Sequence, residues 1–205
     1  EVGNYAHIFA DKNFLLFIGA FTLTQIASAM VWVLLSVYAK NQYGILEKQY
    51  GFIPMTNALM VVLFQVFVTR KTKSYRPLSV MSVGAFFYAT GVTSIALGTT
   101  FWHFWSSMVV ITIGELMLVP TATTYTANLA PPNMRGRYMS IFSLTWGFGT
   151  GVGPLIGGYL NDTIRPQAIW FGGGLIALFG MLWFAGQTYQ QKEKASDGHT
   201  PSEAV

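Results

Sequence analysis

The sequence predicts an all-α integral membrane protein with six transmembrane helices. Two observations lead to this prediction: the composition of the chain and the spacing of its apolar segments. Of the 205 residues, 52% are hydrophobic, 16% are aromatic and only 10% are charged. A soluble domain normally carries about 25% charged residues, so this chain has too few to build a water-facing surface. A helical bundle embedded in lipid is the fold class that fits.

Six apolar segments, each of about 18–25 residues, divide the chain. Each is long enough to cross roughly 30 Å of hydrocarbon as a helix that rises about 1.5 Å per residue. Transmembrane strands would be about half as long and would alternate in polarity, which these segments do not. The predicted spans are Phe14–Tyr38, Phe52–Thr69, Leu78–Leu97, Phe104–Asn128, Tyr138–Leu160 and Ala168–Gln187.

We expect three regions in the chain. Residues 1–13 lead from the cytoplasm into the bundle, residues 14–188 form the six-helix transmembrane bundle, and residues 189–205 form a disordered cytoplasmic tail. Loop charges set this orientation, because cytoplasmic loops are enriched in Lys and Arg. The side of both termini holds Lys12, Arg70, Lys71, Lys73, Arg76, Arg135, Arg137, Lys192 and Lys194, and the other side holds Lys40, Lys48 and Arg165. The sequence therefore predicts a multi-pass protein of the cell membrane with both termini in the cytoplasm.

The composition also argues against several classes of function. The chain has no cysteine, which excludes disulfides, thiol catalysis and cysteine-based metal sites. No group of histidines or acids has metal-ligand spacing, so we expect no metal, no cofactor and no enzymatic activity. The net charge is +4, but the cations lie between apolar segments and not along an exposed face. We therefore expect no nucleic-acid partner.

Glu115 is the only formally charged residue inside the six segments. A carboxylate at bilayer depth costs about 2.5–3.5 kcal/mol on an insertion scale, so it is usually retained for a functional reason. At helical rise it lies roughly 18 Å into the fourth span, near the bilayer midplane. Burial favours the neutral form of a carboxyl group, so Glu115 can load and release a proton. The sequence leaves two roles open: proton coupling or substrate contact, and a neutral group that hydrogen-bonds a neighbouring helix.

Glycines cluster around Pro154 in the fifth span. Gly149, Gly153 and Gly157 form two GxxxG pairs, which let another helix approach closely. Pro154 cannot donate to the helix ladder and is expected to bend the helix. Together with Gly158, these residues predict a helix that flexes or slides, as alternating access requires. Close packing alone is the other interpretation.

Other polar and aromatic residues inside the spans are candidates for a substrate cavity: Gln25, Asn57 and Trp146. Amides at membrane depth must find partners, so Gln25 and Asn57 are expected to face the bundle or a wet cavity. Hydrogen bonding between helices is the alternative role for both amides.

Basic residues mark the predicted cytoplasmic loops. Arg70 begins a basic run after the second span, and Arg135 and Arg137 follow the fourth. We expect the run that begins at Arg70 to anchor the topology and to contact phospholipid. Gating by this loop is the alternative.

Three stretches of the sequence resemble the Major Facilitator Superfamily. They are GELMLVP at Gly114–Pro120, LAPPNMRGRY at Leu129–Tyr138 and GTGVGPLIGG at Gly149–Gly158. The resemblance is to the carboxyl-terminal six-helix half of a twelve-helix transporter and is nearest to drug:proton antiporters. The first two stretches are also similar to proton-coupled peptide carriers.

Such a half is built from inverted three-helix repeats, and substrate lies at the interface between two halves. The resemblance implies that the first, second, fourth and fifth spans line the cavity. This puts Gln25, Asn57, Glu115 and Trp146 on cavity-lining helices. Because the chain begins at Glu1 and not at Met, we expect an amino-terminal six-helix half in the same polypeptide. Two associating copies of the chain are the alternative.

We therefore predict secondary active transport of a small organic solute by alternating access, as proton-coupled efflux. A proton-coupled nutrient or peptide symporter is the alternative within this class. A six-helix homo-oligomeric channel or membrane scaffold is the alternative from another class. The expected partners are the solute, protons and the lipid bilayer.

Overall fold

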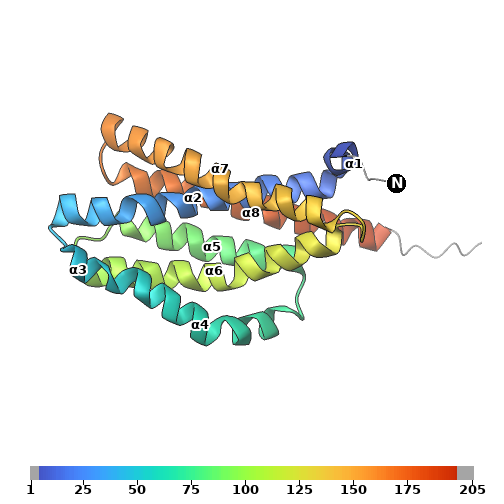
Figure 1. The fold of residues 1–205 in the computed structure, drawn as a ribbon, viewed down its shortest axis with the longest axis horizontal. Coiled ribbons are helices and arrows are strands. Elements are labelled where there is room, and N and C mark those ends of the chain that lie inside the picture. The colour runs from blue at the N-terminus through green and yellow to red at the C-terminus, as the bar shows by residue number, and fades with distance from the viewer. Residues whose placement is uncertain (1–4, 198–205) are drawn as a thin grey trace, which may run out of the picture.

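A computed structural model of the protein describes residues 5–197, with side chains described from residue 7 to residue 193. Every regular element in this part of the chain is a helix, and the long helices run roughly parallel or antiparallel to one another (Figure 1). The prediction of an all-α fold is therefore confirmed. The helices are α1 (Tyr5–Ala10), α2 (Lys12–Tyr43), α3 (Glu47–Tyr50), α4 (Phe52–Thr72), α5 (Pro77–Ile95), α6 (Phe101–Leu129), α7 (Arg135–Thr163) and α8 (Ala168–Asp197).

The ends of the helices follow from local sequence. Asp11 caps α2, because its carboxylate accepts the backbone N–H of Phe14 at 3.1 Å. Gly44 ends α2 in the left-handed conformation at φ 65°, which glycine adopts without steric cost. Pro77 stands in the first turn of α5, where its missing N–H would have no partner in the helix.

Five helical segments are long and apolar enough to cross a membrane: Lys12–Tyr43, Glu47–Thr72, Pro77–Ile95, Phe101–Leu129 and Ala168–Glu193. The sixth predicted span, α7, is as long as α6 but falls outside this set. Its apolar stretch contains many glycines, which are less hydrophobic than the residues of the other spans. For α7 the membrane span stays a prediction that rests on its length and its place in the bundle.

The predicted tail is partly wrong. Helix α8 does not end near Gln187 but continues to Asp197, so residues 189–197 are helical and not disordered. A helix can leave the bilayer and continue into water, whereas hydropathy marks only the part in lipid. The remaining tail, residues 198–205, lies outside the described residues.

The predicted cationic side corresponds to one end of the bundle. The α4–α5 and α6–α7 connections lie at the same end as α1 and the carboxyl end of α8 (Figure 1). Arg70, Arg135 and Arg137 therefore share this end of the molecule. Which end faces the cytoplasm stays a prediction from the positive-inside rule.

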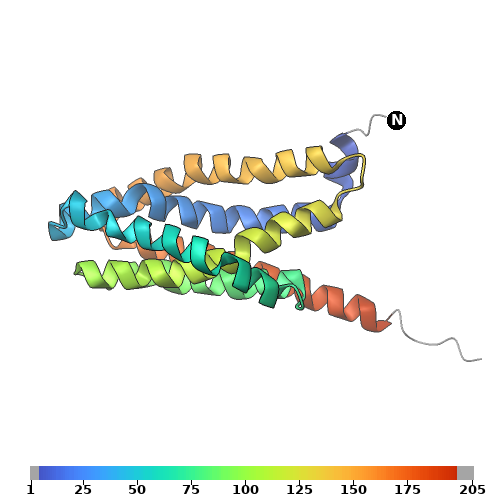
Figure 2. The same ribbon diagram turned by 60° about the horizontal axis from the view of Figure 1, so that its bottom comes forward.

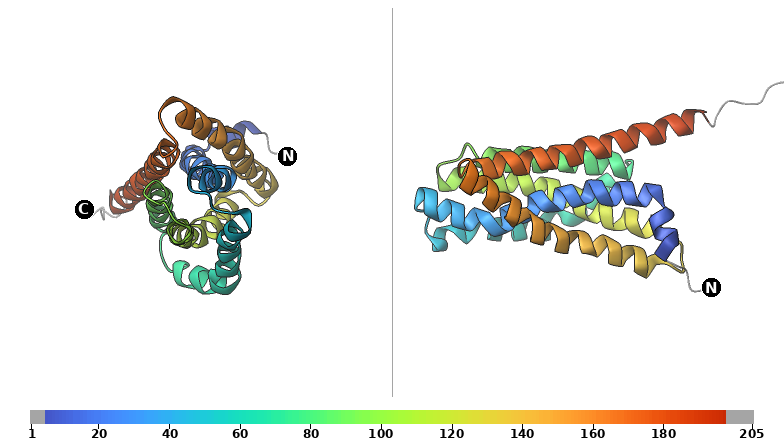
Figure 3. Two further views of the ribbon diagram at one scale, coloured as in Figure 1. Left: turned by 90° about the vertical axis from the view of Figure 1, so that its left-hand side faces the viewer. Right: turned by 90° about the horizontal axis from the view of Figure 1, so that it is seen from above.

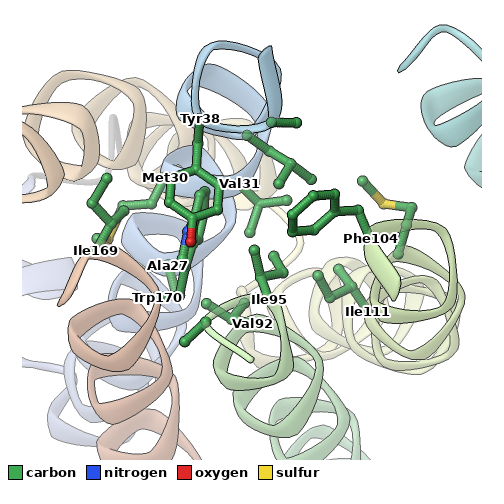
Figure 4. Packing of buried hydrophobic residues seen from close by; sticks show 14 of the residues in the cluster. Ala27, Met30, Val31, Tyr38, Val92, Ile95, Phe104, Ile111, Ile169 and Trp170 are labelled. Atoms are coloured by element: carbon green, nitrogen blue, oxygen red, sulfur yellow. The ribbon is translucent and has the colours of Figure 1, made fainter. Parts of the chain in front are cut away.

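Two buried apolar clusters hold the bundle together, one towards each end. In the cluster around Met30 and Val92, side chains of α2, α5, α6 and α8 interlock (Figure 4). Trp170 is fully buried in it and packs edge-on against Tyr38, with ring centroids 5.1 Å apart. Trp170 is the third residue of α8, so the core of the bundle extends close to this end of the helix.

Helix α4 lies at the edge of the bundle, alongside α6 and away from α8 (Figures 2 and 3). Only two of its side chains are buried, Ile53 and Asn57. Its apolar side chains, such as Leu63 and Phe67, point away from the bundle and are more than half exposed. Helix α4 therefore has few buried side chains to hold it against its neighbours.

Candidate functional site

Glu115 of α6 faces a cavity of about 230 Å³ between α2, α5, α6 and α7. Its lining residues are Gln25, Ser28, Ala29, Trp32, Val33, Tyr88, Glu115, Val119, Trp146 and Thr150. Three of the four predicted cavity residues thus meet in one place, although their roles stay predictions. The fourth, Asn57, is not a lining residue but donates a hydrogen bond to Glu115.

The carboxylate of Glu115 is held by Asn57 of α4. The amide Nδ2 of Asn57 donates to Glu115 Oε2 at 2.7 Å and to Thr112 Oγ1 at 2.9 Å. Thr112 in turn donates to the backbone oxygen of Met108, so its hydroxyl proton is already used. Asn57 is buried, whereas Glu115 is half-buried and reaches the cavity. One oxygen of the carboxylate is therefore fixed to α4 while the group remains accessible from the cavity.

Aromatic side chains form much of the cavity wall. Trp146 of α7 packs edge-on against Phe142 and Phe21, with ring centroids 4.8 Å and 5.3 Å away. Trp146 is 37% exposed and Trp32 is 41% exposed, so both indole rings offer surface to the cavity. A cation over an indole face is attracted by the ring quadrupole. The site therefore combines one carboxylate with aromatic surfaces.

Gln25, the Ser28–Tyr88 pair and Thr150 supply the rest of the polar lining. Gln25 is 6% exposed and lies one helical turn before Ser28 on α2. The hydroxyls of Ser28 and Tyr88 lie 3.3 Å apart and join α2 to α5. These groups supply neutral donors and acceptors close to the single charge of Glu115.

Glycines let α7 approach α2 beside the cavity. A Cβ atom on Gly149 would lie 2.7 Å from the backbone oxygen of Gln25, and one on Gly153 would lie 2.6 Å from that of Ile26. A Cβ on Gly157 would meet Leu34 at 2.3 Å. The three glycines of the GxxxG pairs therefore form the contact face of α7.

Gly158 and Pro154 are the other two residues of α7 that were predicted to let this helix flex. A Cβ on Gly158 would have no neighbour within 4 Å, so this residue is not part of the α2 contact. Pro154 lies inside the continuous helix α7 and removes the hydrogen bond to the carbonyl of Thr150, which lines the cavity. That these residues let α7 flex stays a prediction.

Two further hydrogen bonds that join α4 to α6 were not predicted from the sequence. Gln65 donates to the backbone oxygen of Leu116 at 3.1 Å, and Trp105 donates through its indole N–H to Thr56 at 2.8 Å. Gln65 follows Asn57 by eight residues, which places both amides on one face of a helix. This eight-residue spacing is the sequence pattern from which a contact of Gln65 with the bundle could have been predicted.

The loop arginines lie away from the cavity. Arg70 and Arg135 are exposed at the end of the bundle and are not among its lining residues. Within residues that the structure describes, no three His, Asp or Glu side chains gather as a metal site would need. The chemistry of this cavity is that of one carboxylate among neutral groups.

A sequence profile described as Major Facilitator Superfamily matches residues 16–204. The chain belongs to the Major Facilitator Superfamily. This superfamily chain is 28% identical to a Na(+), Li(+), K(+)/H(+) antiporter of Planococcus maritimus over 85% of its own length and 42% of the antiporter. It is 25% identical to the multidrug resistance protein MdtH of Photorhabdus laumondii over 85% of itself and 43% of that protein.

An uncharacterised transporter of the same superfamily, YdeE of Escherichia coli K12, is 27% identical over 60% of the chain and 31% of YdeE. The chain thus spans less than half the length of these relatives. As a member of this superfamily, and with five helical segments long and apolar enough to cross a membrane, the chain is part of a multi-pass membrane protein.

Proposed function

We propose that this chain forms one wall of the translocation path in a secondary transporter that exchanges a small organic cation for protons by alternating access. The observation that carries the proposal is the single carboxylate of Glu115 in an aromatic-walled cavity. A lone carboxylate can hold a proton or neutralise a cation, but it does not do both well at once. This mutual exclusion is sufficient to couple the two flows in opposite directions.

The aromatic surfaces support an organic cation. Cation–π attraction is worth about 0.5–2 kcal/mol, and Trp32 and Trp146 both line the cavity. The names of two relatives are partly consistent with this proposal, because one is named as an antiporter and another as a multidrug resistance protein. Since the chain spans about two-fifths of those proteins, we expect the opposite wall from a second six-helix half.

An alkali cation is the second candidate solute. The relative from Planococcus maritimus is named for exchange of sodium, lithium and potassium against protons. The carboxylate of Glu115 and the hydroxyls of Ser28 and Tyr88 supply the oxygen atoms that such hard cations prefer. Against it, a cavity of about 230 Å³ walled by indole rings is larger than a bare ion needs.

Transport by the protein in proteoliposomes under an imposed pH gradient tests the proposal. An aromatic organic cation and sodium are supplied in separate arms. Glu115→Gln is expected to reduce proton-driven exchange of the transported cation by at least about tenfold, because the glutamine can neither load a proton nor neutralise a cation. The matched control is Glu47→Gln, since Glu47 is an exposed acid that pairs with Lys40 at the far end of α2.

Three results would contradict the proposal. Full exchange by the Glu115→Gln protein would remove the coupling role of this carboxylate. Co-entry of solute and protons would indicate symport. Flux that does not saturate with solute concentration would indicate a channel.

A further inference from the structure

Helix α4 is held to α6 by polar side chains at three places. Nearest to the α3 end, Thr56 accepts the indole N–H of Trp105. Next to it, Asn57 donates to Thr112 and Glu115, and two turns further on Gln65 donates to the backbone of Leu116. In lipid there is no hydrophobic driving force between helices, and only two side chains of α4 are buried, so these hydrogen bonds matter for its position.

Only one of the three attachments ends on a group whose charge can change. Thr56, Trp105, Gln65 and the Leu116 carbonyl stay neutral, whereas Glu115 exists as a carboxylate or a carboxylic acid. A hydrogen bond that ends on a carboxylate is roughly twice as strong as one between neutral groups. Protonation of Glu115 therefore weakens the central attachment and leaves the other two unchanged.

We infer that Asn57 is a positioning residue through which ionised Glu115 holds the amino-terminal third of α4 against α6. Protonation of Glu115 turns the charge-assisted hydrogen bond from Asn57 into a weaker bond between neutral groups, and this part of α4 moves outward. The inference rests on the proposed function in taking Glu115 as the group that gains and loses a proton. It goes beyond that function by assigning α4 as the helix that responds.

Two titratable side chains, Glu115 and Tyr88 of α5, are found among the described residues that line the cavity. The residues of α2 and α7 that face the cavity, among them Gln25, Ser28 and Trp146, do not titrate there. A structural response to pH in this region is therefore assigned to Glu115 or to Tyr88. Substitution of Tyr88 by phenylalanine separates the two groups.

Spin-label distances in the reconstituted protein test the inference. The chain has no cysteine, so two introduced cysteines are labelled without background. One label at Val62, which is 78% exposed on α4, pairs with one at Phe86 on α5. We expect this distance to lengthen from alkaline to acidic pH. A control pair at Val83 on α5 and Leu182 on α8 is expected to stay constant, because neither helix contacts Asn57 through a hydrogen bond.

Four variants of the labelled protein decide whether Asn57 transmits the change. Asn57→Leu and Glu115→Gln are expected to abolish the dependence on pH. Gln65→Leu and Tyr88→Phe are expected to keep it. Should Asn57→Leu fail to fold, Asn57→Ser serves in its place, because the shorter side chain cannot reach both acceptors.

A shift that persists in the Asn57 variants would overturn the inference, as would a parent protein without any shift. In either case, loss of proton-driven exchange in Glu115→Gln would leave the proposed function standing. A Tyr88→Phe protein that loses the shift would assign the response to Tyr88 and would also overturn the inference.

Discussion

The amide Nε2 of Gln65 donates to the backbone oxygen of Leu116 at 3.1 Å. Leu116 lies four residues before Pro120, and proline has no N–H to donate to the carbonyl four residues earlier. The α4 side chain therefore supplies the hydrogen bond that α6 lacks at its own proline. An unsatisfied carbonyl in the hydrocarbon region costs several kcal/mol, which gives this contact a structural reason.

Gln65→Leu is expected to destabilise the protein by about 0.6–2 kcal/mol, the range for interhelical hydrogen bonds in membranes. In the Pro120→Ala background the cost is expected to fall, because the alanine N–H can reach the Leu116 carbonyl. Thermal unfolding in detergent of the two single variants and the double variant measures this coupling. Equal costs in both backgrounds would show that Gln65 does not compensate for Pro120.

The packing of the α7 glycines predicts that alanine substitutions at Gly153 and Gly151 have different effects on stability. Gly153→Ala places a methyl group 2.6 Å from the Ile26 carbonyl, whereas Gly151→Ala enters open space. Both gain about 1 kcal/mol of helix propensity, so the difference between them reports the contact alone. Gly153→Ala is expected to be less stable than Gly151→Ala by about 1–3 kcal/mol, as for overpacked cores. Matched unfolding curves check this, and equal stabilities would mean that α7 does not pack on α2 through Gly153.

Much of the architecture could be predicted because hydropathy reports directly on the bilayer. Segments such as Leu78–Leu97 have the length that a hydrocarbon core requires, and α5 forms within two residues of it. The carboxyl end of α8 could not be predicted in this way, because residues 190–197 are helical but polar. The burial of Trp170 also could not, since it depends on the contact between α8 and the Tyr38 face of α2.

Only part of the candidate site could be predicted from the sequence, and the reason is geometrical. Glu115 is recognisable because one charge in an apolar span has a cost that sequence alone reveals. Its pairing with Asn57 depends on how α4 is rotated about its axis, and α4 is apolar on nearly every face. Thr112 lies three residues before Glu115 on the same helix face, so its proximity was available from spacing.

The aromatic wall predicts a selective effect of Trp146. Trp146→Ala is expected to raise the KM for an aromatic organic cation by about 3–30-fold, which corresponds to the loss of about 0.5–2 kcal/mol of cation–π attraction. The matched control is Trp102→Ala, since Trp102 is 70% exposed at one end of α6 and away from the cavity. Uptake measured against solute concentration distinguishes the two. An unchanged KM in Trp146→Ala, or an equal change for Trp102→Ala, would remove Trp146 from the substrate site.

Gly114, the neighbour of Glu115, sets how closely α5 and α6 approach. A Cβ on Gly114 would lie 2.5 Å from the backbone oxygen of Gly84 and 3.0 Å from the ring of Tyr88. Because the backbone oxygen cannot move aside, Gly114→Ala is expected to separate the two helices and displace Glu115 from the cavity. We expect proton-driven exchange to fall by at least about tenfold and stability to fall by about 1–3 kcal/mol.

Gly147→Ala is the matched control for Gly114→Ala, because a Cβ at Gly147 would have no neighbour within 4 Å. It lies inside α7 and gains the same helix propensity of about 1 kcal/mol. Exchange assays and unfolding curves for both variants, recorded on the same preparations, separate the loss of helix contact from the loss of glycine. If Gly114→Ala matched Gly147→Ala in both measurements, the α5–α6 contact would have no part in positioning Glu115.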